Sequence, residues 1–109
     1  MWKVLVLNDV VDSEIRALPE PMRARLAKII DLIETSGLER LPRDLSRHLE
    51  DKLWELRVRD RDGISRAIYI TATGQRVVIL RVFVKKTQKT PPQELRLAKQ
   101  RARDIDETF

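Results

Sequence analysis

The spacing of apolar residues changes its period once along this chain. Between residues 21 and 36 the apolar side chains recur every three or four positions, which is the spacing of one helix face. From residue 53 the period becomes two, because Trp54, Leu56 and Val58 stand at every second position. A helical segment followed by alternating strands within 109 residues predicts a single α+β domain over residues 1–109.

Turn dipeptides divide the alternating part into strands. Asp62-Gly63 and Thr73-Gly74 separate the apolar runs, and both favour tight turns because Gly tolerates positive φ. They predict an antiparallel meander with strands over residues 53–59, 64–71 and 76–84. The segment Thr90-Pro91-Pro92-Gln93 follows and has the pattern of a capping box, which predicts a final helix with Thr90 as its N-cap.

The region before the meander predicts a helical hairpin behind a short strand. The strand covers residues 2–7, and helices follow over 10–18 and from Pro21 to the stop at Gly37. Residues 38–49 are expected to form a loop. The predicted order is therefore β-α-α-β-β-β-α, with an antiparallel sheet packed against the N-terminal helical hairpin and a C-terminal helix.

Several classes of site are excluded by composition. The chain has no Cys, which excludes disulfides, thiolate metal sites and a cysteine nucleophile. His48 is the single histidine, so a multi-histidine metal centre is excluded as well. No uninterrupted apolar run is longer than four residues, the length of Val4 to Leu7, which is far too short to cross a membrane. We expect a soluble, cytoplasmic protein.

The net charge of +5 is unevenly distributed. Residues 1–80 hold 14 basic and 13 acidic side chains, whereas residues 81–103 hold eight basic side chains and Glu94 alone. The last six residues are acidic, with a charge of −3. Clustered Lys and Arg favour a polyanionic partner such as nucleic acid, although a solvated basic helix face is the commoner meaning of such a stripe.

The predicted strands carry several candidate binding residues. Arg57 and Arg59 lie on the polar side of the first meander strand. Arg66 lies on the same face of the second meander strand as Ile64, Ile68 and Ile70. An arginine on such an apolar face lies either at the mouth of a cleft or in an ion pair with an acid such as Glu55. For any one of these cations alone, an ordinary solvated ion pair is the commoner role.

Other polar and aromatic residues near the meander have simpler expected roles. Lys85 and Lys86 end the third strand and should point to opposite faces, so one of them at most enters a given cleft. Trp54 shares its parity with Leu56 and is expected in the core. His48 is expected to be solvated in the loop.

At these positions the chain resembles a known family. The segment Leu53-Trp54-Glu55-Leu56-Arg57, followed by Arg66 and by the run from Phe83 to Pro91, is similar to the phage-derived HigB-like branch of the RelE/HigB toxins. The resemblance extends from about Trp2 to Asp104. It implies the small microbial-RNase fold of that family, with which the element order derived above is compatible.

The resemblance also implies a function. It suggests the toxin of a type II toxin–antitoxin system, a ribosome-dependent endoribonuclease that cleaves mRNA by attack of a 2′-hydroxyl on the adjacent phosphate, with no metal or cofactor. The implied partners are mRNA on the ribosome and a cognate helix-turn-helix antitoxin, with no membrane. By position, the implied catalytic residues are Arg57, Arg66, Lys85 and Lys86. The expected RNA-binding residues are Arg59, Arg81 and Lys89.

Two other functions fit the same residues. A ParE-type protein uses this fold to inhibit DNA gyrase without catalysis, and a plain RNA-binding module would hold phosphates without cutting. The sequence also departs from the family pattern, because Pro92 stands about where some members carry a tyrosine that acts on the substrate.

Overall fold

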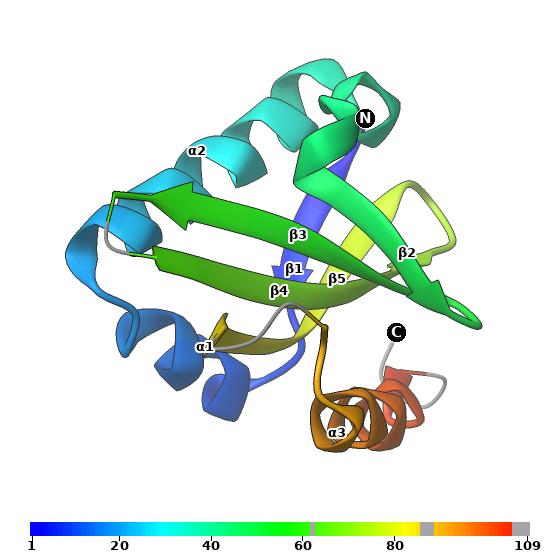
Figure 1. Cartoon of the computed structure of the whole chain (residues 1–109). Helices are drawn as coiled ribbons and strands as arrows, with labels where there is room; N and C mark the ends of the chain where they lie inside the picture. The colour runs from blue at the N-terminus through cyan, green and yellow to red at the C-terminus, as the bar shows by residue number, and fades with distance from the viewer. Residues whose placement is uncertain (62, 86–88, 106–109) are drawn as a thin grey trace.

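The computed structural model describes residues 1–61, 63–85 and 89–105. It has three α-helices, two short 3-10 turns and one five-stranded sheet among these residues (Figure 1). In chain order the elements are β1 (Lys3–Val6), α1 (Asp9–Arg16), α2 (Glu20–Ser36), η1 (Leu38–Arg40), η2 (Arg43–Leu45), β2 (Ser46–Glu50), β3 (Leu53–Asp60), β4 (Gly63–Ala72), β5 (Arg76–Lys85) and α3 (Pro92–Ala102).

The sheet is mixed, with the strand order β1-β5-β4-β3-β2. The predicted meander forms β3, β4 and β5, and these strands are antiparallel. The prediction of a wholly antiparallel sheet is wrong at β1, which pairs parallel to β5. The prediction of a loop over residues 38–49 is wrong as well, because β2 pairs antiparallel to β3 and adds a strand to the expected order.

The two faces of the sheet are covered by different helices (Figure 1). The helical hairpin of α1 and α2 covers one face, and α3 covers part of the other. The core under the hairpin contains Met22, Leu26, Ile29, Ile33, Leu56, Val58, Ala67 and Tyr69. The core under α3 contains Leu53, Ile68, Ile70, Val78, Leu80, Ala98 and Ile105. The predicted α+β class and the packing of the sheet against the hairpin are thereby confirmed.

Helix ends follow the sequence signals in two cases and depart from them in one. The side chain of Asn8 accepts a hydrogen bond from the amide of Val11, 3.1 Å away, and caps α1. Gly37 ends α2 with a φ of 97°, a conformation that favours Gly. The predicted cap at Thr90 is wrong, because Pro91 is the N-cap of α3 and no side chain caps this helix. The Thr90 hydroxyl instead binds Glu55 in the sheet.

A β-bulge in β5 decides which side chains reach which face. Ile68 pairs with Arg81 and its neighbour Tyr69 pairs with Ile79, so Leu80 is an extra residue in β5. Leu80 and Arg81 therefore both turn toward α3. Beyond the bulge every second residue, including Lys85, lies on the α3 side of the sheet.

The expectation of a core position for Trp54 is wrong, because 39% of its surface is exposed. Its side chain lies on the same face of β3 as that of Leu56, but Trp54 is the second residue of the strand and lies next to the turn that joins β2 to β3. There its ring meets the ring of His48 edge-on, with centroids 5.0 Å apart. His48 is itself exposed, as expected, although it lies in β2 rather than in a loop.

Candidate functional site

The α3 side of the sheet divides into an apolar half under α3 and a charged half beyond it. In the charged half, strand pairing aligns Arg57 with Arg66 and Arg59 with Ile64. The alignment continues across β5, where Ile64 pairs with Lys85. Directly paired residues share a face, so these cations lie on one surface. We call Arg47, Arg57, Arg59, Arg66 and Lys85 the basic face.

Arg47 is a member of the basic face that the sequence did not predict. It pairs with Glu55 across β2 and β3, which puts it on the same side of the sheet as Arg57. It was missed because residues 38–49 lack the alternation of apolar residues that indicates a strand. The spacing from the turn at Asp51-Lys52 would not have found it, because a regular hairpin there brings residue 48 opposite residue 55; the register shift between His48 and Glu50 puts Arg47 in that place instead.

A buried carboxylate stands at the centre of the basic face. Glu55 is 0% exposed and forms an ion pair with Arg66, which is 2% exposed. The Thr90 hydroxyl donates to the other carboxylate oxygen of Glu55 over 2.8 Å and also lies 3.4 Å from the Arg66 guanidinium. Of the two positions that the sequence left open for Arg66, the structure therefore selects the pair with Glu55.

The charge around Glu55 is not balanced. The Nε of Arg57 lies 3.8 Å from the same Glu55 oxygen that Arg66 binds, and Arg57 remains 22% exposed. Burial lowers the pKa of Arg66, the positive charges of Arg57 and Arg47 lower it further, and Glu55 opposes both effects. One carboxylate thus faces three guanidinium groups, which leaves a positive potential at the surface above it.

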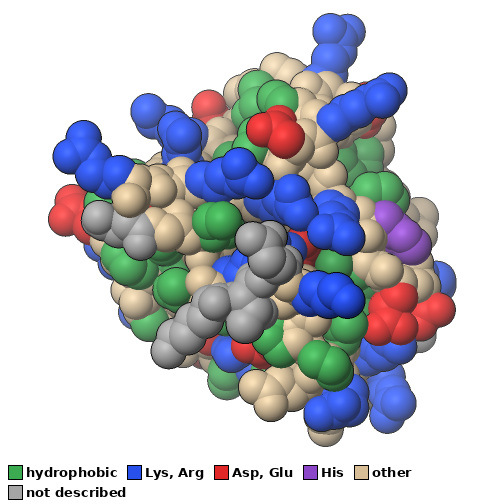
Figure 2. Space-filling model, viewed as in Figure 1, with side chains coloured by type: hydrophobic (Ala, Val, Ile, Leu, Met, Phe, Trp, Pro, Cys, Tyr) green, Lys and Arg blue, Asp and Glu red, His purple; other side chains and the backbone are tan. Residues whose placement is uncertain are grey.

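Basic side chains gather over β2 and β3 on this face, between α2 and α3 (Figure 2). Arg47 and Arg59 are exposed, and neither forms an ion pair with a carboxylate in the described part of the chain. Arg47 also lines a hollow of about 220 Å³ together with Lys89 and Thr90. Of the expected RNA-binding residues, Arg59 is therefore an exposed member of the basic face, and Lys89 is exposed and lies beside Arg47.

Lys85 and Lys86 differ in what can be said of them. Lys85 lies at the end of β5, in line with Ile64 and Arg59, so it shares the face of Arg66. Lys86 lies outside the described residues. From the sequence we expected at most one of the two lysines to enter a given cleft. The strand register places Lys85 on the basic face.

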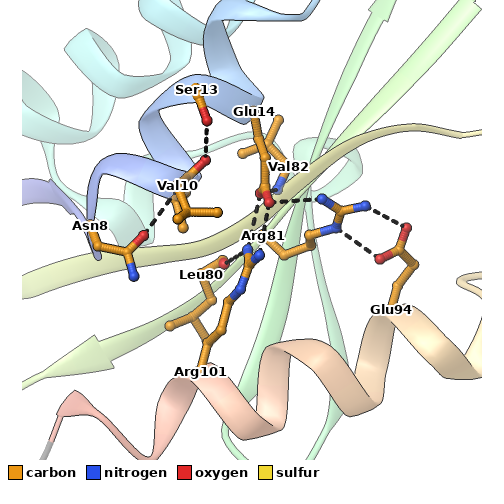
Figure 3. Close-up of polar contacts among 10 residues, drawn as sticks. Asn8, Val10, Ser13, Glu14, Leu80, Arg81, Val82, Glu94 and Arg101 are labelled. Atoms are coloured by element: carbon orange, nitrogen blue, oxygen red, sulfur yellow. Dashed lines mark hydrogen bonds and ion pairs between the residues drawn. The ribbon is translucent and has the colours of Figure 1, made fainter.

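Arg81 lies on the same side of the sheet, but in a different environment (Figure 3). Its Nε is 2.8 Å from Glu94 in α3, and its Nη1 is 2.8 Å from Glu14 in α1. Glu14 also binds Arg101 at 2.9 Å and accepts a hydrogen bond from the Val82 amide at 3.1 Å. We call Glu14, Arg81, Glu94 and Arg101 the ionic network.

The ionic network joins three elements and balances its own charge. Arg101 donates to the carbonyl oxygen of Leu80, the extra residue of the bulge, over 2.8 Å. Burial would raise the pKa of Glu14, but its hydrogen bonds from Arg101 and Val82 and the charge of Arg81 more than offset this and lower the pKa. The network thereby fixes α1 and α3 to β5, which gives Arg81 a structural contact. Its predicted role in RNA binding stays a prediction.

The described residues contain no group of three His, Asp or Glu side chains arranged to hold a metal ion. None of the helices in the described ranges is long and apolar enough to cross a membrane. What the basic face offers chemically is therefore fixed positive charge. Several guanidinium groups and one ammonium group on one rigid sheet can bind an oxyanion and stabilise negative charge that develops on it.

The chain matches the model of a known protein family over most of its length. The family model described as "Phage derived protein Gp49-like (DUF891)" matches residues 13–103, which is most of the chain. No curated protein matches the sequence of this chain. The matched range includes all five residues of the basic face and the whole ionic network.

Proposed function

The chain belongs to the Gp49-like family of phage-derived proteins, a RelE-like family associated with toxin–antitoxin systems, and we propose that it is the toxin of a type II pair. We further propose that it is of the HigB type and inhibits translation by cutting mRNA on the ribosome. The support comes from the family, the resemblance of its strand residues to HigB-like toxins, and the charge of the basic face.

The observation that carries this proposal is the excess of cations around one buried carboxylate. Glu55 balances one guanidinium, which leaves Arg47 and Arg57 without a full counter-charge. An RNA phosphate at this position supplies the missing negative charge and releases counterions from the RNA. Because the cations are fixed on three adjacent strands, they need little rearrangement when charge develops on the phosphate.

The proposed reaction is an internal transfer of the phosphate. The 2′-oxygen of a ribose bonds to the adjacent phosphorus, the bond from phosphorus to the 5′-oxygen breaks, and a 2′,3′-cyclic phosphate and a 5′-hydroxyl form. The 2′-hydroxyl loses a proton and the 5′-oxygen gains one, so the reaction needs neither water nor a metal ion. Negative charge accumulates on the non-bridging oxygens in the transition state, where positioned cations stabilise it most.

The depth of each cation suggests its role. Arg57 is partly exposed and can contact the non-bridging oxygens directly, whereas Arg66 is buried and acts from beneath through its charge and its hold on Glu55. Lys85, with Lys86 next to it in the sequence, would stabilise charge and donate the proton to the leaving oxygen. Arg59 and Lys89 are exposed and would hold neighbouring phosphates.

We also propose a protein partner. A cognate helix-turn-helix antitoxin would neutralise the toxin, and an acidic segment of such a partner could cover the basic face. This function requires no cofactor, because transfer of the phosphate to the 2′-oxygen involves no oxidation and no group carrier.

Expression of the protein without an antitoxin tests the proposal. We expect growth arrest and cleavage of translated mRNA, mapped by sequencing RNA 5′ ends, and we expect both to disappear in Arg57→Met. The control is Lys3→Gln, which removes an exposed cation at the opposite edge of the sheet. Arrest with intact mRNA and damaged DNA would replace the proposal with gyrase inhibition. RNA binding without arrest would replace it with a non-catalytic binding module.

A further inference from the structure

A second basic hollow lies where β3 has no neighbouring strand. β2 pairs with β3 only as far as Leu56, so residues 57–60 form a free edge. Helix α2 and the turn η2 border this edge and leave a hollow of about 350 Å³. Its lining comes from α2, η2 and β3, three elements that are separated in the sequence. We call it the edge hollow.

The rim of the edge hollow is strongly positive. Arg25 and Lys28 come from α2, Arg57 and Arg59 come from β3, and Asp44 is the one carboxylate among the described residues that line it. Arg25, Lys28 and Arg59 form no ion pair with any described carboxylate. The Nε of Arg25 donates to the carbonyl oxygen of Arg59 over 3.1 Å, which fixes one wall to the other and satisfies an acceptor of the free edge.

The floor of the edge hollow is apolar. Ile29, Leu32 and Leu45 line it, and Ile29 is 5% exposed while the other two are partly buried. A cationic rim over an aliphatic floor matches the two parts of a nucleotide, a charged phosphate and a flat, weakly polar base. The volume is at the lower end of the range typical of small-molecule pockets, which suits one nucleotide.

Arg57 connects the edge hollow to the basic face. Its Nε lies 3.8 Å from Glu55 on the α3 side of the sheet, and the same residue is part of the lining of the edge hollow. Consecutive phosphates of an extended nucleic acid are about as far apart as side chains two residues apart on one face of a β-strand. A single-stranded nucleic acid that contacts Arg57 can therefore also reach the edge hollow. The two sites therefore form one continuous path around the edge of β3.

We propose that the edge hollow binds the nucleotide adjacent to the phosphate held at Arg57. Arg25 and Lys28 hold its phosphate, and its base lies on Ile29, Leu32 and Leu45. Asp44 accepts a hydrogen bond from an amino or imino group of that base, which gives a preference among bases. The substrate must be single-stranded at this point, because a paired base cannot turn its face onto the floor. This inference rests on the proposed RNA substrate.

Binding of a non-cleavable RNA tests the inference separately from catalysis. The probe is a fluorescent single-stranded octanucleotide with 2′-O-methyl groups throughout, so that no 2′-oxygen can attack. We expect the variant with Arg25→Gln and Lys28→Gln to bind it about ten- to thirty-fold more weakly at 0.1 M salt, because two phosphate contacts are lost. The slope of log Kd against log salt should fall by roughly 0.7, because the one phosphate that these two side chains hold is no longer neutralised. A dinucleotide that carries a single phosphate cannot bring one phosphate to Arg57 and another to Arg25 and Lys28, so with its phosphate at Arg57 it should bind parent and variant equally.

The matched control is Lys52→Gln, which removes an exposed cation from the turn between β2 and β3, away from the edge hollow. Equal weakening by the control and the double variant would overturn the inference, and so would equally tight binding of a duplex. Asp44→Asn should change the ranking of the four octanucleotide homopolymers, and an unchanged ranking would remove Asp44 from the site. If the parent cuts no mRNA but the double variant still loses binding selectively, the proposed catalysis fails while the edge hollow stands.

Discussion

Two arginine clusters on one side of the same sheet differ in how their charge is balanced. In the ionic network, Arg81 and Arg101 face Glu14 and Glu94, so two cations meet two carboxylates. At the basic face, the described carboxylate of Glu55 faces the guanidinium groups of Arg66, Arg57 and Arg47. Of the five basic-face cations, all but Arg66 lie at least partly at the surface. The number of carboxylates within reach, rather than the number of arginines, therefore separates a structural cross-link from a candidate binding site.

The largest expected effect is on stability, at the one carboxylate of the basic face. Glu55→Ala leaves Arg66 buried without its counter-charge, so the free energy of unfolding should fall by about 3–5 kcal/mol. Urea denaturation followed by circular dichroism measures this. Replacing both partners, with Glu55→Leu and Arg66→Met, should restore most of the loss because no buried charge remains. A double variant as unstable as Glu55→Ala would show that the pair is held together by something other than charge balance.

The next effect separates the two clusters by activity. Arg57→Met should reduce mRNA cleavage by roughly 10²–10³-fold, the usual cost of losing one positioned group that stabilises transition-state charge. Its free energy of unfolding should change little, because Arg57 is partly exposed. Cleavage of a defined message on translating ribosomes is the measurement. If Arg81→Met reduces cleavage as strongly while remaining folded, the distinction between the clusters is wrong.

Arg81→Met should act mainly on stability. It removes contacts to Glu94 and Glu14, and both carboxylates are largely buried, so we expect a loss of about 1.5–3 kcal/mol in the free energy of unfolding. Hydrogen exchange should become faster in α3, because Arg81 binds this helix to β5. A variant with parental stability and unchanged exchange in α3 would contradict a structural role for the ionic network.

Acid should weaken the ionic network by protonating its carboxylates, because the guanidinium groups stay charged at low pH. The folded-state pKa of Glu14 is lowered, so its stabilising contribution is complete above its unfolded pKa of about 4.3 and is lost as the pH falls through the folded value. The difference in free energy of unfolding between the parent and Glu14→Gln should be constant from pH 7 to 5 and shrink below that. A difference that stays constant down to pH 2 would mean that the Glu14 charge contributes nothing.

The smallest expected effect is on the salt dependence of RNA binding. Arg59→Gln removes one exposed cation of the basic face, so the slope of log Kd against log salt should fall by roughly 0.7, with little change in cleavage of bound RNA. Arg96→Gln, on the exposed surface of α3, provides the comparison. Equal slopes for the two variants would place Arg59 outside the path of the RNA.

Much of the fold follows from local patterns in the sequence. The period of two predicted the strands β3, β4 and β5, and the helical period predicted α2 with its stop at Gly37. Strand β2 was missed because its five residues include Arg47, His48 and Glu50, which show no alternation of apolar side chains. It forms because β3 offers backbone partners beyond the turn at residues 51–52, so tertiary pairing outweighs local preference.

The candidate site was predicted less completely than the fold. Parity and composition identified Arg57, Arg59 and Arg66 as strand cations, and the resemblance to a family singled out Arg57 and Arg66 among the 22 basic residues. Thr90 was predicted as a helix cap, yet its hydroxyl binds Glu55 instead. A local motif competes with partners that are distant in sequence, and here a buried carboxylate oxygen that needs a donor takes the hydroxyl.

The sequence alone was enough to predict the class of the fold and the segment that carries most of the positive charge. For Arg66 it left two alternatives, the mouth of a cleft or an ion pair with an acid. Only the tertiary structure decided which cations share a surface. The bulge at Leu80 sets the face on which Arg81 and Lys85 lie, and the start of β2 at Ser46, opposite Leu56, leaves the free edge of β3 that borders the edge hollow. The physical reason is that a strand's register is fixed by its partner, and one extra residue turns every later side chain to the other face.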